Sequence, residues 1–221
     1  MIKAILFDLD GTLIDTVELI IETFQHTART VLQRELSREE IVPTFGLTLA
    51  EAFAGFTDDA AMAERMREAY REYNEIHHDR LISRIDGVED VLGKIAQAGY
   101  KQAVVTSKKR LMAQRGLRCC GLEAYIETIV ACGETVMAKP HPEPMLKACR
   151  LLGVAPEECL CIGDSPFDLQ SGKSAGTLTA AVRYTAYDWQ RLLQEGQPDF
   201  IINEPSDILD ILEGLRKGRS I

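Results

Sequence analysis

Short apolar runs alternate with amphipathic stretches along most of the chain. The apolar runs, which predict strands, lie at 3–9, 101–107, 128–133, 159–164, 178–184 and 200–203. Between them, stretches such as 88–100 and 143–154 repeat their apolar residues with a helical period and end near a glycine. Strands that alternate with helices are typical of βαβ units, so we expect an α/β fold built on a parallel sheet.

The segment 16–81 departs from this alternation. It contains no convincing strand, and the stretch 58–81 has a long helical period with many charged residues. We therefore predict two domains: an α/β core made of residues 1–15 and 82–221, and an all-helical domain, residues 16–81, inserted into it.

The composition is that of an ordinary globular protein, with 46% hydrophobic and 27% charged residues in a chain of 221. Its net charge of −9 argues against a nucleic-acid partner, because a phosphate backbone requires a basic surface. The basic run at 107–110 is about one helical turn long, and we interpret it as a solvated helix end.

No window approaches the roughly 20 apolar residues of a membrane span, and the chain opens without a leader segment. We expect a cytoplasmic protein with no membrane partner, and both a monomer and a dimer remain open.

Two aspartates, Asp8 and Asp10, stand at the end of the first predicted strand. Alternate residues of a strand point to the same side, so carboxylates this close repel each other unless a cation binds them. A hard divalent ion such as Mg²⁺ prefers oxygen ligands and leaves room for a substrate phosphate. Gly11 permits a tight turn directly after the pair, and Thr12 offers a hydroxyl group and a backbone amide. This end of the strand is therefore predicted to hold a metal ion.

Three more positions at the predicted strand ends carry side chains of related chemistry. Thr106 and Ser107 supply hydroxyl groups ahead of a helix, where an anion can bind, although Ser107 would also serve as a helix N-cap. Lys139 precedes a proline and could neutralise a phosphoryl oxygen; taken alone, it would be a surface lysine. Asp164 is expected to bind the metal, whereas Asp168 either caps a helix or supports the metal site. Ligands of open parallel sheets bind at the carboxyl ends of the strands, so we expect one shared site.

Four motifs in this order, DLDGT, VVTS, AKPHPEP and GDSPFD, resemble those of the haloacid dehalogenase-like (HAD) superfamily of phosphohydrolases. The resemblance spans the whole chain. It implies a Rossmann-like, doubly wound parallel sheet as the core and a helical-bundle cap as the insert. Within this superfamily, the stretches 73–81, 139–148 and 198–203 look most like bacterial pyrophosphatases, with phosphoglycolate phosphatases as close relatives.

The resemblance also implies a reaction through an aspartyl-phosphate intermediate. Asp8 is implied as the nucleophile, and Asp10 as the group that protonates the leaving oxygen and then activates water. Mg²⁺ is the implied cofactor, bound by Asp8, by Asp10 through its backbone carbonyl, and by Asp164, with Asp168 in support. Lys139 is implied to neutralise charge on the transferred group. The implied substrate is a small phosphorylated metabolite or pyrophosphate.

The inserted helical domain is expected to select the substrate, because the core motifs recognise only phosphate and metal. The segment 44–53 resembles the cap loop that faces the active site in such enzymes. The residues expected to bind phosphate or substrate are Thr12, Thr106, Ser107, Lys139 and, in the insert, Gly46.

Two other functions remain open. A β-phosphoglucomutase keeps both aspartates of the first motif but usually reads DGV where this chain has DGT, so Thr12 favours hydrolysis. A HAD domain without catalytic activity would act as a regulator or binding module. Every catalytic position of the four motifs is filled here, which argues against that second alternative.

Overall fold

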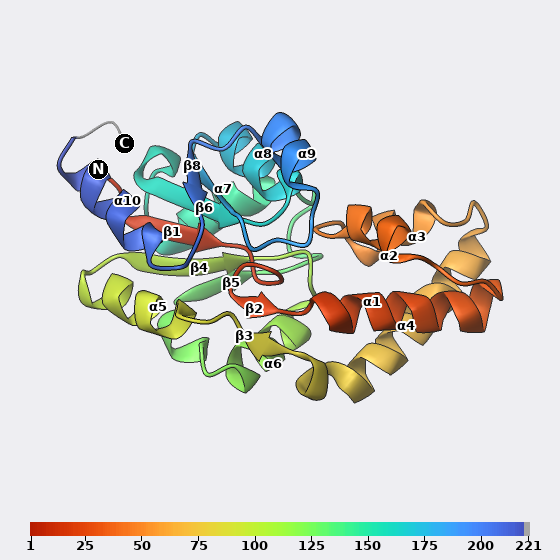
Figure 1. Cartoon of the computed structure of the whole chain (residues 1–221). Helices are drawn as coiled ribbons and strands as arrows, with labels where there is room; N and C mark the ends of the chain where they lie inside the picture. Colours follow the sequence, from red (N-terminus) through yellow and green to blue (C-terminus); the bar gives the residue numbers. More distant parts are fainter. Residues whose placement is uncertain (219–221) are drawn as a thin grey trace.

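Six strands form one parallel sheet in the computed structural model, which describes residues 1–218 (Figure 1). The end of the predicted core, residues 219–221, lies outside the described residues. The strands are β1 (Ala4–Phe7), β4 (Lys101–Val105), β5 (Thr128–Val130), β6 (Cys159–Gly163), β7 (Leu178–Val182) and β8 (Phe200–Ile202). Each lies within its predicted range, so the six predicted strands are confirmed.

The order of the strands is β5-β4-β1-β6-β7-β8. After β1, the chain adds β4 and β5 on one side of it and then returns to add the other three strands on the opposite side. Open α/β sheets bind ligands where the strand order reverses in this way. Phe7 pairs with both Val104 and Ile162, so β1, β4 and β6 end nearly level. Side chains that follow these three strands therefore meet at one edge of the sheet.

Helices cover both faces of the sheet (Figure 1). On one face, Ile5 and Phe7 of β1 pack in a core with α5 (Val88–Gln97), α6 (Arg110–Cys119) and α10 (Asp207–Arg216). On the other face, Ala4 and Leu6 pack in a core with α7 (Glu143–Leu152) and with Ala175 of α8 (Pro166–Ala175). The helix α9 (Trp189–Gly196) packs against α8. A doubly wound α/β core, as predicted, is confirmed.

Residues 17–81, which we call the cap segment, are helical and contain no strand. Their helices are α1 (Val17–Thr27), α2 (Arg38–Ile41), α3 (Leu49–Ala54) and α4 (Ala60–Leu81), with a π-helical turn Ala28–Leu32 and a 3₁₀ turn Val42–Thr44. Phe24, Phe53 and Tyr70 form an aromatic cluster inside this segment, with ring centroids 5.2–5.9 Å apart. The helical character of the insert is confirmed, while the exact domain boundaries stay a prediction.

A short antiparallel ribbon, absent from the sequence-based prediction, joins the cap segment to the core. It pairs β2 (Ile14–Asp15) with β3 (Ser83–Arg84), one strand at each crossing of the chain (Figure 1). Two residues on each side are too short a run for apolar periodicity to reveal. Within residues 1–218, no helix combines the length and apolarity needed to cross a membrane.

Candidate active site

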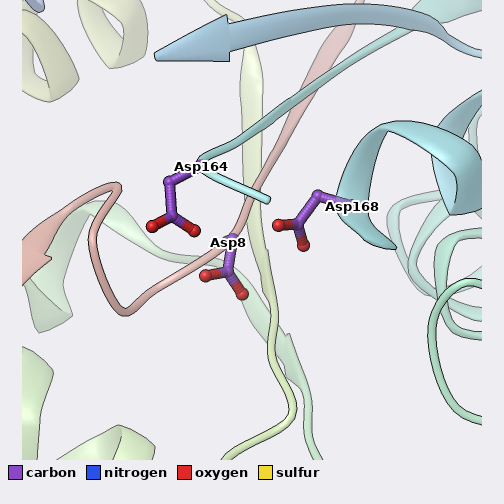
Figure 2. A group of neighbouring side chains, drawn as sticks. All are labelled: Asp8, Asp164 and Asp168. Atoms are coloured by element: carbon purple, nitrogen blue, oxygen red, sulfur yellow. The ribbon is translucent and has the colours of Figure 1, made fainter. Parts of the chain in front are cut away.

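Three buried carboxylates gather at the carboxyl edge of the sheet. Asp8 directly follows β1, Asp164 directly follows β6, and Asp168 lies in the first turn of α8. Each is at most 5% exposed, and one oxygen from each lies within 4.8 Å of the others. Figure 2 shows the three carboxylates close together, each on a different segment of the chain. The level strand ends bring the first two together, and the turn into α8 adds the third.

Asp168 is positioned by the residue that begins its helix. The backbone N–H and the hydroxyl group of Ser165 donate to Asp168 Oδ2 at 3.2 and 2.6 Å. Its other oxygen, Oδ1, contacts the Lys139 ammonium. Asp168 is thus the third helical residue of a capping box whose N-cap is Ser165, so the N-cap alternative for Asp168 is wrong. Its support of a metal site stays a prediction.

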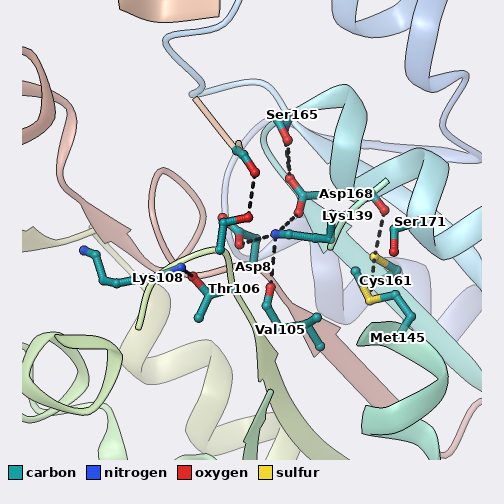
Figure 3. A network of polar contacts seen from close by, with 12 residues as sticks. Asp8, Val105, Thr106, Lys108, Lys139, Met145, Cys161, Ser165, Asp168 and Ser171 are labelled. Carbon is teal, nitrogen blue, oxygen red and sulfur yellow. Dashed lines mark hydrogen bonds and ion pairs between the residues drawn. The ribbon is translucent and has the colours of Figure 1, made fainter. Parts of the chain in front are cut away.

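Lys139 lies among these carboxylates (Figure 3). Its Nζ donates to Asp8 Oδ1 at 2.7 Å and to the Val105 carbonyl at 3.2 Å, and the residue is 2% exposed. The alternative of a surface lysine is therefore wrong. Burial acts to lower the pKa of Lys139, but the carboxylates of Asp168 and Asp8 outweigh burial and raise that pKa. The ammonium group is thus charged and aimed at the predicted nucleophile.

The site holds more negative charge than this one ammonium group neutralises. Burial raises the pKa of Asp8 to about 7, although Lys139 opposes the shift. Burial also raises the pKa of Asp164 well above its ordinary value, and the charges of Asp8 and Asp168 add to that effect. Buried carboxylates that resist ionisation are a suitable donor set for a divalent cation, which prefers oxygen ligands. Asp8, Asp164 and Asp168 are the residues that could hold such an ion.

Gly11 allows the turn after β1 to lie directly against this group. Its φ is +77°, and a Cβ added at this position would overlap the Asp164 carboxylate. The glycine of the DLDGT motif is therefore required both by the backbone conformation and by the space that Asp164 occupies.

The Asp10 carboxylate lies outside the group of three. Asp10 Oδ1 accepts from Lys108 Nζ at 2.6 Å, and both residues line the same cavity as Asp8. The prediction of a solvated helix end is wrong for Lys108, whose side chain is only 14% exposed. The predicted metal contact of Asp10 through its backbone carbonyl stays a prediction.

Thr106 and Ser107 both line the cavity but make different contacts. Thr106 Oγ1 accepts from the Lys108 backbone N–H at 3.1 Å. Ser107 Oγ donates to the Gly46 carbonyl of the cap segment at 2.6 Å. The N-cap alternative for Ser107 is wrong, because α6 begins at Arg110 and its N-cap is Lys109.

Like Asp168, the predicted site residue Thr12 does not line the cavity. It is 1% exposed, and its hydroxyl group has no hydrogen-bond partner within residues 1–218. The turn after Gly11 directs this side chain toward Phe7, Val88 and Tyr184 of the core.

A cavity of about 890 Å³ separates the carboxylates from the cap segment. Gly46 lines it, as predicted, and closely approaches the core: a Cβ added there would lie 2.6 Å from Ser165 Oγ and 3.0 Å from the Phe167 ring. Its φ of +85° also favours glycine. The cap loop thus contacts the turn that carries Asp164 and Asp168.

Sequence reasoning missed several residues of this site. Thr185, in the loop after β7, donates its hydroxyl to the Asp164 backbone carbonyl at 2.9 Å and lies 3.2 Å from Asp164 Oδ2. Helix α4 contributes Tyr70, Arg71 and Asn74 to the cavity lining. The helical spacing of these α4 residues was visible in the sequence, but nothing local indicated that this face meets the cavity. Thr185 carries no local signal, because its partner is 21 residues away.

Comparisons with known proteins agree with this geometry. A family model described as haloacid dehalogenase-like hydrolase matches residues 5–182. A putative pyrophosphatase PpaX of Clostridium perfringens is 44% identical and covers 97% of this chain and 99% of its own length. A pyrophosphatase PpaX of Bacillus cereus is 38% identical and covers 98% and 99%. The crystal structure of a predicted phosphoglycolate phosphatase from Haemophilus somnus matches with a TM-score of 0.85 at 24% identity, over 96% of this chain and 98% of that one.

Proposed function

We propose a phosphatase function for this chain, which belongs to the haloacid dehalogenase-like hydrolase family. Its substrate would be a small phosphorylated compound, cleaved through an aspartyl-phosphate on Asp8. One observation carries the proposal: Asp8 lies at the cavity, held by a buried, charged Lys139 and flanked by Asp164 and Asp168. Nucleophile, neutralising cation and metal-binding carboxylates are thereby within reach of one phosphoryl group.

In the first step, an Asp8 carboxylate oxygen forms a bond to phosphorus while the bond from phosphorus to the leaving oxygen breaks. Asp10, which lines the same cavity, gives its proton to that leaving oxygen. In the second step, Asp10 takes a proton from water as the water oxygen attacks phosphorus. The bond between phosphorus and Asp8 then breaks, which releases phosphate and restores both carboxyl groups. Lys139 favours the ionised form of Asp8, and its charge offsets the negative charge that gathers on the phosphoryl oxygens.

The donor set of the site fits Mg²⁺, the cofactor expected for this family. Asp8, Asp164 and Asp168 would hold the ion, with Thr185 and Ser165 orienting the last two carboxylates. When bound, a divalent cation would neutralise the excess buried negative charge and polarise the phosphoryl group.

Pyrophosphate is the substrate that we favour, and phosphoglycolate is the next candidate. The support for pyrophosphate is the name of the two relatives that are 44% and 38% identical over nearly the whole chain. Both compounds are small, and the cap segment would distinguish them by its contacts to the leaving group.

The test is phosphate release from pyrophosphate, phosphoglycolate and p-nitrophenyl phosphate, each with Mg²⁺ and with a chelator. We expect Mg²⁺-dependent turnover that Asp8→Asn abolishes and that Asp90→Asn, an exposed carboxylate on α5, leaves unchanged. Full turnover by Asp8→Asn, or none by the wild type on any substrate, would overturn the proposal. A phosphorylated isomer formed in place of free phosphate from a sugar phosphate would indicate the mutase alternative.

A further inference from the structure

The cavity extends well beyond the carboxylates, and one face of α4 forms part of its far wall. Tyr70, Arg71 and Asn74 all line it from this helix. They occupy positions i, i+1 and i+4, which places them on adjoining parts of one helix surface. Figure 1 shows α4 running along α1 in the cap segment.

Asn74 contributes an unpaired polar side chain to this wall of the cavity. It is 7% exposed and lines the cavity, yet its amide makes no hydrogen bond to any residue in 1–218. Neither amide atom is fully enclosed by the protein, so both are open to the cavity. A ligand in the cavity would supply the missing partner.

Tyr70, on the same face of α4, interacts electrostatically with Asp10 of the core. Burial raises the pKa of its hydroxyl group, and the negative charge of Asp10 raises it further. Tyr70 also lines the same cavity as Asp10, the residue that we expect to protonate the leaving oxygen. Asn74, one helical turn along from Tyr70, lines that cavity as well.

The charged residues of the same wall favour an anion there. Arg71 forms no ion pair within residues 1–218, so its guanidinium group is available to a ligand. Arg67, one turn earlier, already has Glu64 as its partner. Of the two cap carboxylates in the lining, Glu51 accepts from the Thr48 backbone N–H and hydroxyl. Glu75 is exposed, and its backbone carbonyl accepts from Arg115 of α6.

We propose that Asn74, Arg71 and Tyr70 form a subsite that binds the leaving group of the substrate through a negatively charged end, a phosphate or a carboxylate. The Asn74 amide and the Arg71 guanidinium donate to its oxygens, and Tyr70 lies between that end and Asp10. This inference rests on the phosphatase function proposed above. It assigns recognition of the leaving group to α4 and recognition of the transferred phosphoryl group to the core.

The kinetic test compares substrates with and without a charged end. Asn74→Ala and Arg71→Met are expected to lower kcat/KM for pyrophosphate or phosphoglycolate about tenfold or more, because hydrogen bonds to charged groups are the strong ones. For p-nitrophenyl phosphate, whose leaving group has no charged end, the change should stay within about twofold. Glu72→Ala and Arg65→Met, exposed residues of α4 outside the cavity lining, are the matched controls and should leave all three values unchanged.

The pattern of losses identifies the charged end. A loss confined to pyrophosphate indicates a phosphate, and a loss confined to phosphoglycolate indicates a carboxylate; either result supports the subsite. An equal loss on all three substrates would assign the residues to cap packing and overturn it, as would no loss on either charged substrate. Asn74→Asp, which preserves the size of the side chain, should fold normally and impair the charged substrates more than Asn74→Ala does.

Binding separates this inference from the proposed function, because it requires no turnover. Calorimetric titration with methylenediphosphonate in the presence of Mg²⁺ should give about tenfold weaker binding to Asn74→Ala than to the wild type. Binding of inorganic phosphate, which occupies only the core end, should not change. Equal weakening of both ligands, or weakening of neither, would overturn the subsite even if the wild type proves to be an active phosphatase.

Discussion

A single buried ammonium group, that of Lys139, contacts two of three clustered carboxylates. Asp8 and Asp168 are its direct partners, and Asp164 completes the cluster. At the residue scale, this imbalance of charge explains both the expected affinity for a divalent cation and the sensitivity of the site to substitution. Two predictions follow from it.

Lys139→Met should destabilise the protein strongly when no metal is bound. The substitution leaves the Asp8 and Asp168 carboxylates buried without a cation, and breaking a buried ion pair in this way costs about 3–5 kcal/mol. Urea unfolding at pH 8 in a chelator would measure the loss of unfolding free energy. Lys173→Met, at an exposed position of α8, should change it by less than about 0.5 kcal/mol. A Lys139→Met protein as stable as the wild type would contradict the charge argument.

Mg²⁺ should stabilise the protein more at pH 8 than at pH 5. Burial raises the pKa of folded Asp8 to about 7, above its ordinary value of 3.8. Between these values the folded state binds more protons than the unfolded chain, so the stability of the metal-free protein falls as the pH rises through this range. Mg²⁺ binds the ionised carboxylates and offsets the loss. The shift of the thermal midpoint on adding Mg²⁺ is the measurement; an equal or larger shift at pH 5 would contradict this account.

At the scale of elements, the loop before α3 connects the cap segment to the segments that follow β4 and β6 in the core. Gly46 in this loop accepts a hydrogen bond from Ser107, which follows β4, and packs against Ser165, which begins α8. One glycine thus contacts two of the strand-end motifs.

Gly46→Ala should impair catalysis more than stability. A Cβ at φ +85° is strained and would lie 2.6 Å from Ser165 Oγ, so the loop would be displaced from the core. We expect kcat/KM to fall about tenfold, while the unfolding free energy falls by only about 1 kcal/mol. Gly55→Ala is the control, because Gly55 ends α3 with an ordinary φ of −74°. Unchanged kinetics in Gly46→Ala would show that the contact of this loop with the core does not affect turnover.

At the scale of the whole molecule, the cap segment is attached to the core at its hinge by more than the β2–β3 ribbon. Arg115 of α6 donates to both oxygens of Asp79 at the end of α4, at 2.8 and 3.0 Å. The neighbouring His78 is fully buried, with Nδ1 2.8 Å from Asp79 Oδ1 and Nε2 unpartnered within residues 1–218. A buried, titratable ring therefore lies where the two parts of the molecule join.

The contribution of His78 to stability should be lost in acid. Burial lowers the pKa of His78 even though its contact with Asp79 acts in the opposite direction. The unfolded chain then binds the proton more readily, so this contribution is present above about pH 6.5 and declines as the pH falls below that value. The difference in unfolding free energy between wild type and His78→Gln should therefore shrink from pH 7.5 to pH 5. A wild-type advantage that grows in acid would contradict this prediction.

Much of this arrangement was predictable because it depends on local patterns. Each strand of the parallel sheet is a buried apolar run, and the residue type that follows it, as with Asp8 and Asp164, is visible without any partner. Lys139 was identified only by its place in the order of motifs, and its burial was not predictable. Lys108 was misread because its partner, Asp10, is 98 residues away in the sequence.

The sequence by itself determined the α/β class, the helical insert, the family and the carboxylates at the strand ends, because periodicity and residue order carry that information. Only the tertiary structure decided that Asp10 pairs with Lys108, that Thr12 faces the core, and that Asn74 faces the cavity. These outcomes depend on how a turn is directed and how the cap segment packs against the sheet. Such long-range contacts arise from the summed packing of many residues, which no short stretch of sequence records.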